Sequence, residues 1–196
     1  MVQKTPRPRG RPRGFDPDAA LRSAGERFRS RGFSATSLDD IVEATGLARP
    51  SLYAAFGDKR ALYLAALEQV TARTARRLDG LASLGLPLRE MVATMLAATI
   101  DGYLTGELGP AGCLAVGTAS SEAAADPAIA EALRRFVRME DEKIAECLVA
   151  AGSPHPEGHA RVLAAVVHSL SVRTRAGATR EELERVAADA AMLIAP

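Results

Sequence analysis

Tryptophan is absent from the 196-residue sequence, aromatic residues make up 4% of it, and only two cysteines and three histidines occur. Two cysteines in a chain of this length do not build a disulfide framework, so we expect Cys113 and Cys147 to be buried free thiols. No apolar run approaches the ~20 residues that a membrane span needs. The basic, proline-rich N-terminus lacks the apolar run of a secretory signal. We therefore expect a cytoplasmic protein with no membrane partner.

Motifs of enzymes and metal sites are also missing. The sequence has no Gly-rich phosphate loop, no zinc-protease histidine pair around a glutamate and no nucleophile elbow. His155 and His159 have a spacing that can suit a metal, with Glu157 close by, but Pro156 and Gly158 disfavour a regular helix between them. We expect a solvated loop there, no metal, no cofactor and no catalysis. An enzyme is the alternative that turnover on any ligand would reveal.

Charge is distributed unevenly along the chain, although the net charge is only +1. Residues 1–60 carry 12 Lys or Arg against 7 Asp or Glu, whereas residues 61–196 carry 13 against 17. A basic front on an acidic body indicates an anionic partner for the front alone, and duplex DNA is the obvious candidate.

The rest of the composition favours helices. Ala, Leu, Glu and Arg recur in long stretches, and β-branched clusters are few. Asp16 followed by Pro17 is typical of a helix start, and the pairs Ser37–Asp40 and Thr179–Glu182 have the spacing of capping boxes. We predict an all-α fold of about nine helices without strands, preceded by a disordered basic arm at residues 1–14.

Residues 33–56, FSATSLDDIVEATGLARPSLYAAF, carry the most specific pattern. They predict a short capped helix, a tight turn at Gly46 and a second short helix from Arg49 to Phe56. This is the plan of a helix-turn-helix, whose second helix enters the major groove of DNA. Because such short helices bury little surface by themselves, we expect them to pack on the helices before and after them.

The same stretch resembles the TetR family of transcriptional regulators. The resemblance is specific over about residues 16–65 and looser in GCLAV (112–116) and RAGATREEL (175–183). Its residues are Gly32-Phe33, Thr36-Ser37, Ile41, Gly46-Leu47, Leu52-Tyr53, Phe56 and Lys59. The resemblance implies a helix-turn-helix DNA-binding domain at residues 15–60 and a helical ligand-binding and dimerisation domain at residues 61–196. It also implies a homodimeric repressor that a small-molecule effector releases from a palindromic double-stranded DNA operator.

The resemblance assigns DNA contacts to particular positions. Arg49, Pro50 and Ser51 would face base edges, with Arg49 alone suited to bidentate guanine recognition. Phosphate contacts would come from Thr36, Ser37, Tyr53 and Lys59. The alternatives are a packing role for Tyr53 and a solvated helix-end lysine at position 59. The sequence departs from the family at Ala48, which cannot cap the recognition helix, and at Ala54-Ala55, where members often carry Tyr-His.

The arm supplies a second signal for DNA. Arg9 and Arg11 flank Gly10 in a segment that resembles the core of an AT-hook, whose arginines lie in the narrow minor groove of A·T tracts. The alternative is a solvated tail that adds only nonspecific charge.

For the regulatory half, the resemblance implies a dimer surface and a ligand cavity. The last two helices carry small and apolar residues suited to close packing with a second copy, namely Ala165, Ser169, Leu183, Val186 and Ala190. Their alternative is to cover the core of the monomer. Candidate cavity residues are Met95, Thr99, Tyr103, Cys113, Phe136 and His168, and each could instead belong to the core. Cys113 carries a separate hypothesis as an oxidant or electrophile sensor, although no basic residue adjoins it.

An architectural DNA-binding protein is the alternative from another functional class. It would account for the arm and the helix-turn-helix pattern. It would not account for an acidic domain of about 130 residues. Footprinting distinguishes the two, because a regulator protects one short palindrome and an architectural protein protects DNA broadly.

Overall fold

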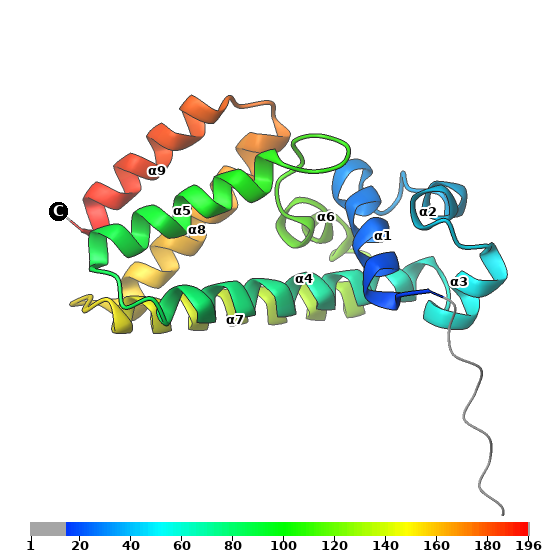
Figure 1. The fold of residues 1–196 in the computed structure, drawn as a ribbon, viewed down its shortest axis with the longest axis horizontal. Helices are drawn as coiled ribbons and strands as arrows, with labels where there is room; N and C mark the ends of the chain where they lie inside the picture. The colour runs from blue at the N-terminus through cyan, green and yellow to red at the C-terminus, as the bar shows by residue number, and fades with distance from the viewer. Residues whose placement is uncertain (1–14, 196) are drawn as a thin grey trace, which may run out of the picture.

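A computed structural model describes residues 15–195, and that part of the chain consists of nine α-helices and one π-helical segment, with no strand (Figure 1). The prediction of an all-α fold is therefore confirmed. The elements are α1 (Pro17–Arg31), α2 (Leu38–Thr45), α3 (Arg49–Phe56), α4 (Lys59–Ala82), α5 (Leu88–Leu104), η1 (Ala115–Ala119), α6 (Ser120–Glu122), α7 (Pro127–Ala150), α8 (Pro156–Arg175) and α9 (Arg180–Ile194).

Helix starts follow the local sequence. The carboxylate of Asp16 accepts a hydrogen bond from the Asp18 amide at 2.9 Å, ahead of Pro17 at the first helical position. Ser37 and Asp40 form a reciprocal capping box at α2, and a second box starts α9 at Thr179. These caps satisfy backbone N–H groups that have no partner inside a helix. The capping predictions are confirmed.

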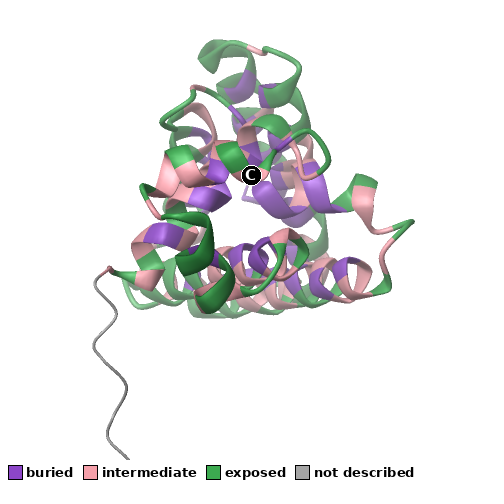
Figure 2. Ribbon diagram, turned by 90° about the vertical axis from the view of Figure 1, so that its right-hand side faces the viewer, coloured by how far each residue is buried: buried purple, intermediate pink, exposed green. Residues whose placement is uncertain are grey.

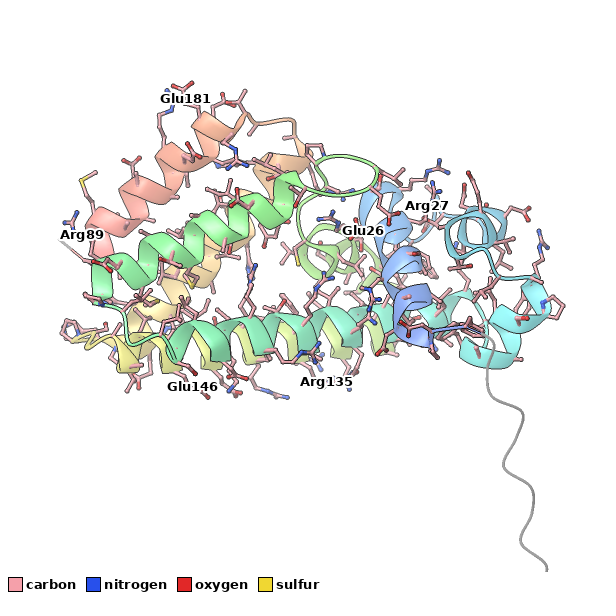
Figure 3. The ribbon with its side chains drawn as sticks, in the orientation of Figure 1. Glu26, Arg27, Arg89, Arg135, Glu146 and Glu181 are labelled. Atoms are coloured by element: carbon pink, nitrogen blue, oxygen red, sulfur yellow. The ribbon has the colours of Figure 1, made fainter. Side chains whose placement is uncertain are left out.

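The long helices α4 and α7 pack side by side along the length of the molecule (Figure 1). Helices α1 to α3 gather at one end of this pair, and α5, α8 and α9 at the other. Viewed from the α1–α3 end, buried positions face inward and the outer turns are exposed (Figure 2). In Figure 3, Arg135 and Glu146 lie on the outer side of α7, away from α1 and α5. The molecule therefore has two ends joined by a two-helix spine.

Two hydrophobic clusters fill the interior. The cluster at the α1–α3 end, which we call the reading-end cluster, centres on Phe28, Ile41, Leu52 and Tyr63, and it also includes Phe136 from α7. The cluster at the opposite end, which we call the far-end cluster, is built from α5, α8 and α9 with the C-terminal parts of α4 and α7. Because the reading-end cluster includes residues of both α1–α3 and the body, the first three helices share their core with the rest of the chain.

The segment 112–123 contains the π-helical η1 followed by a single turn, α6. Gly112 has φ +67° and lies against α8, so that a Cβ atom there would stand 2.6 Å from the Ser171 carbonyl oxygen. The Cys113 amide donates to Ser171 Oγ at 2.8 Å. This close crossing requires glycine at position 112, because a side chain would clash with backbone. Within residues 15–195, no helix is long and apolar enough to cross a membrane.

Candidate DNA-binding surface and effector cavity

The outer face of α3 is open to solvent. Gly46 ends α2 in the left-handed conformation (φ 66°, ψ 11°), which turns the chain sharply into α3. Leu52 points into the reading-end cluster, whereas Tyr53 is 47% exposed. We give the name reading face to five exposed residues on this side, namely Ser37, Arg49, Pro50, Ser51 and Tyr53.

Arg49 has one acidic neighbour on this face. Its Nη2 atom donates to Oδ1 of Asp39 at 2.5 Å, and this carboxylate raises the pKa of the guanidinium. Hydrogen bonds from Ser37 lower the pKa of the Asp40 carboxyl, which keeps the capping box charged. The exposed Arg49–Asp39 pair holds the guanidinium beside α2 but is open to exchange with another anion.

Thr36, next to Ser37, is not part of the reading face. Its side chain is 1% exposed, and its hydroxyl donates to the Gly32 carbonyl oxygen at 2.6 Å, behind the end of α1. The Thr36 side chain, which was expected to contact phosphate, is therefore buried and engaged, because its hydroxyl satisfies a carbonyl that the end of the helix leaves unpaired.

Lys59 is partly buried and already engaged. Its Nζ atom donates to the Thr36 carbonyl oxygen at 2.8 Å and lies 4.5 Å from the centre of the Phe33 ring. These contacts tie the start of α4 to the turn before α2. The charge stays at this edge, with two further N–H donors on the same ammonium.

The start of α3 shows the missing cap that the sequence predicted. Ala48 occupies the N-cap position, and no side chain caps the helix there. Its carbonyl oxygen accepts from the Ser51 and Leu52 amides at 2.9 and 3.1 Å. The recognition helix thus starts with backbone contacts and proline alone.

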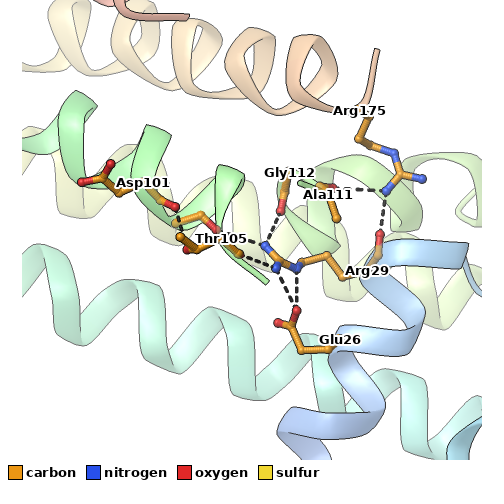
Figure 4. A network of polar contacts seen from close by, with 8 residues as sticks. Glu26, Arg29, Asp101, Thr105, Ala111, Gly112 and Arg175 are labelled. Atoms are coloured by element: carbon orange, nitrogen blue, oxygen red, sulfur yellow. Dashed lines mark hydrogen bonds and ion pairs between the residues drawn. The ribbon is translucent and has the colours of Figure 1, made fainter. Parts of the chain in front are cut away.

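A buried arginine fastens α1 to the body (Figure 4). Arg29 is 8% exposed, and its Nη1 atom donates to the carbonyl oxygens of Gly102 and Gly112, both at 3.1 Å. Its Nη2 atom donates at 2.8 Å to Thr105 O and to Glu26 Oε2. Three backbone carbonyls and one carboxylate thus surround the charge, which meets the requirement for burying it.

Arg175 completes this arrangement from the end of α8. Its Nη1 atom donates to the Arg29 carbonyl oxygen at 2.7 Å and to the Ala111 carbonyl oxygen at 3.3 Å. We name the set Glu26, Arg29, Thr105, Gly112 and Arg175 the junction. Sequence reasoning missed it because, apart from the Glu26–Arg29 pair three positions apart, its bonds join residues between 64 and 146 positions apart and leave no local pattern.

A cavity of about 620 Å³ adjoins the junction. Its walls come from α1, α4, α7, the end of α5 and the loop that follows α5. Tyr103, Cys113 and Phe136 line it, as do Glu26 and Arg29; Glu26 lies on the side of α1 nearest this loop (Figure 3). Burial raises the pKa of Tyr103 well above its usual range and raises that of the Cys113 thiol. A raised pKa lowers the thiolate fraction, so it gives no support to a sensor role for Cys113.

The other three expected cavity residues lie elsewhere. Met95 packs in the far-end cluster, and Thr99 is buried with its hydroxyl donating to Met95 O at 2.8 Å. His168 contacts Glu140 instead, with Nε2 and Oε2 2.7 Å apart, and that hydrogen bond raises the pKa of the imidazole. Helical spacing identified these residues as inward-facing but could not tell packed core from cavity wall.

Comparison with known proteins decides the family. The model of "Bacterial regulatory proteins, tetR family" matches residues 20–66, and that of "Tetracyclin repressor-like, C-terminal domain" matches residues 87–195. The chain belongs to the TetR family of bacterial transcriptional regulators. The resemblance seen in the helix-turn-helix is therefore confirmed and extends over the body as well.

Individual TetR-family proteins match over most of their length. The chain is 33% identical to the HTH-type transcriptional repressor ComR of Escherichia coli, over 91% of this chain and 89% of ComR. The repressor BdcR of the same organism is 27% identical over 96% and 93%. Among solved structures, a cysteine mutant of the regulator CifR with 26-base-pair double-strand operator DNA has a TM-score of 0.71, 33% identity and coverage of 93% and 98%.

Helices α8 and α9, which were expected to form the dimer surface, have both buried and exposed residues. Leu183 and Ala190, which were expected in a dimer surface, are 0% and 4% exposed in the single chain and pack in the far-end cluster. Ala165 is exposed, and Ser169 and Val186 are half-buried. The large apolar side chains exposed on α8 and α9 are Val162, Val172, Met192 and Leu193.

Two remaining expectations concern the arm and a metal. Arg9 and Arg11 lie outside the described residues. In the part of the chain that the structure describes, no three His, Cys, Asp or Glu side chains gather as metal ligands would. His159 Nδ1 lies 2.8 Å from Ser153 Oγ at the start of α8, and His155 is the N-cap of that helix.

Proposed function

We propose that this TetR-family chain is a homodimeric repressor that reads a palindromic operator with α3 and leaves it when a small-molecule effector binds. The observation that carries the proposal is the reading face: side chains suited to base edges and phosphates project from α3 while Leu52 anchors the helix inside. ComR and BdcR are named repressors, and CifR was solved with its operator. These likenesses support the same role here.

On DNA, the reading face would divide into base-reading and backbone-positioning groups. Arg49 exchanges Asp39 for a guanine edge, where its fork can donate to O6 and N7. Pro50 and Ser51 lie at the same end of α3. The Ser37 end of α2, Tyr53 and the free donors of Lys59 lie where they can hold phosphates, and they fix the register of α3 in the groove.

A dimer gives the reading face its second half-site. One helix-turn-helix reads only a few base pairs, and two-fold pairing places two of them a whole number of turns apart. We assign the interface to the exposed sides of α8 and α9, with Ala165, Ser169 and Val186 among the residues that meet the second copy. Leu193 is 79% exposed, which is a cost in water that a partner surface removes.

The division of labour follows the chain. Residues 15–60 carry the DNA-binding role, and residues 61–196 carry the effector and dimer roles. The effector acts by preferring one of two dimer states, since only that difference in affinity can shift the equilibrium.

Genomic SELEX with the full-length chain tests the proposal. The expected result is enrichment of one short palindrome, bound by a dimer, and a ligand screen against that complex then finds the effector. Broad protection of unrelated DNA in footprints would contradict it in favour of an architectural protein.

The arm and the interface have separate tests. Deletion of residues 1–13 should weaken operator binding and flatten its salt dependence, because counterion release scales with the phosphates neutralised. An unchanged slope would show that Arg9 and Arg11 do not contact DNA. Leu193→Glu should produce monomers in sedimentation, whereas exposed Val149→Glu, on α7, should leave the dimer intact.

A further inference from the structure

The cavity beside the junction combines an apolar floor with a basic rim. Phe136, Leu114 and Tyr103 contribute the floor, and four arginines line the same space. An apolar pocket with a few placed polar groups is the usual form of a small-molecule site. The arginines therefore decide what chemistry the cavity can hold.

Two of the four arginines are already neutralised within the protein. Arg29 pairs with Glu26 at 2.8 Å and donates to three carbonyls. Arg22 lies 3.7 Å from Asp16 at the start of its own helix. Neither needs a ligand to balance its charge.

The other two, Arg73 and Arg77, stand one turn apart on α4 and face the cavity with Ala66 and Val70. Neither forms an ion pair with a residue that the structure describes, and residues 1–14 contain no acidic side chain. Their spacing along one helix face lets both guanidiniums reach one group.

Carboxylates in the lining cancel this charge only in part, because the lining holds four arginines and three glutamates. Glu140 is occupied by His168 at 2.7 Å, and Glu26 by Arg29. Glu107, on the exposed loop after α5, is the one further acidic residue of the lining and also makes no ion pair with a described residue. The rim of Arg73 and Arg77 thus carries an excess of positive charge above an apolar floor.

We infer that the effector is an organic carboxylate whose anionic end is held by Arg73 and Arg77 and whose apolar body lies on Phe136, Leu114 and Tyr103. The inference rests on the proposed function for calling this ligand the effector. Guanidinium groups hold carboxylates through paired, charge-assisted hydrogen bonds, which gives both affinity and orientation.

The position of the site explains how such a ligand would reach the DNA-binding helices. Helix α1 supplies one wall through Ser23, Glu26 and Arg29, and Arg29 is the residue that fastens α1 to Gly112 and Thr105. An anion in the cavity competes with the Glu26 carboxylate for electrostatic attraction to the Arg29 guanidinium. Binding therefore acts on the contact that sets where α1, and with it α2 and α3, sits on the body.

Calorimetric titration of the full-length protein tests the chemistry. The probes are straight-chain carboxylates of 8 to 14 carbons, 4-phenylbutyrate and naphthalene-1-acetate, each paired with its primary amide. At least one carboxylate should bind at least tenfold more tightly than its amide. The double variant Arg73→Gln/Arg77→Gln should lose that preference. Arg76→Gln is the matched control, because Arg76 is exposed on the same helix and lies outside the cavity lining.

The inference is overturned if no carboxylate in the panel binds, if the amides bind as tightly as the carboxylates, or if the double variant keeps the preference for carboxylates. Thermal unfolding checks that the variants fold. We expect them to fold because all three arginines are exposed on α4. Operator release is measured separately: a carboxylate that binds with full arginine dependence but leaves the DNA complex intact supports the anion site and contradicts the proposed release mechanism.

Discussion

The reading face and the junction both use arginine, but in opposite settings. Arg49 on the reading face is exposed and has a single carboxylate beside it. Arg29 in the junction is 8% exposed and has five hydrogen bonds to four partners. A side chain that must exchange partners on DNA is held weakly, and one that must fix a helix is saturated. Loss of Arg29 should therefore lower the free energy of unfolding, whereas loss of Arg49 should lower the affinity for operator DNA.

The largest effect is expected from Arg29→Ala. It removes a buried charge and leaves Glu26 and three carbonyls without their donor, so the free energy of unfolding should fall by about 3 kcal/mol. Urea denaturation followed by circular dichroism measures this. Arg22→Ala, on the same helix but exposed, should unfold like the unchanged protein; equal losses in the two variants would contradict a special role for the junction.

A smaller loss, with a pH signature, is expected from His168→Gln. Glu140 is buried, and a hydrogen bond to a charged group contributes about 2 kcal/mol. Because the pKa of His168 is raised in the folded state, the stabilisation is fully present below the ordinary histidine pKa of about 6.5 and is lost as pH rises through the folded value. The stability gap to the variant should therefore narrow from pH 6 to pH 9.

Glu140→Gln checks the cause of that trend. It removes the partner charge and should abolish the same pH dependence, even though His168 is still present. A stability gap that stays constant or widens with rising pH would show that the pair is not charged in the folded protein.

On the reading face, Arg49→Ala should leave the unfolding transition unchanged and weaken operator binding about tenfold or more, since a bidentate guanine contact is lost. Fluorescence anisotropy with labelled operator measures the affinity. Arg134→Ala removes another exposed charge, from α7, and this variant should bind operator as the unchanged protein does. If both variants bind equally well, Arg49 reads no base.

Local patterns predicted the fold and the reading helices but not the connections between them. Ser37 and Asp40 lie three residues apart, so their capping box is visible in the sequence. Thr36 adjoins them, yet its burial depends on a carbonyl at the end of α1 that no spacing reveals.

Long-range contacts are a second reason why parts of the structure could not be predicted from the sequence. Leu183 and Ala190 share the periodic apolar pattern of a dimer surface and of a core, and only the packing of α9 on α5 and α8 assigns them to the core. The junction arises where α1, the α5–η1 loop and α8 meet, and the cavity arises where α1, α4, α7 and the same loop meet. Periodicity within one helix does not show which other segment that helix contacts.

The smallest effect is expected at the start of α3. Ser at an N-cap can accept a hydrogen bond from the amide two or three positions on, and with Pro50 at the second position only the Ser51 amide remains for it. Ala48→Ser should therefore slow hydrogen exchange of the α3 amides and raise the free energy of unfolding by about 1 kcal/mol. Ala48→Gly, which supplies no acceptor, is the control and should gain less. Equal protection in the two variants would show that packing through Leu52, rather than its first turn, limits the stability of the recognition helix.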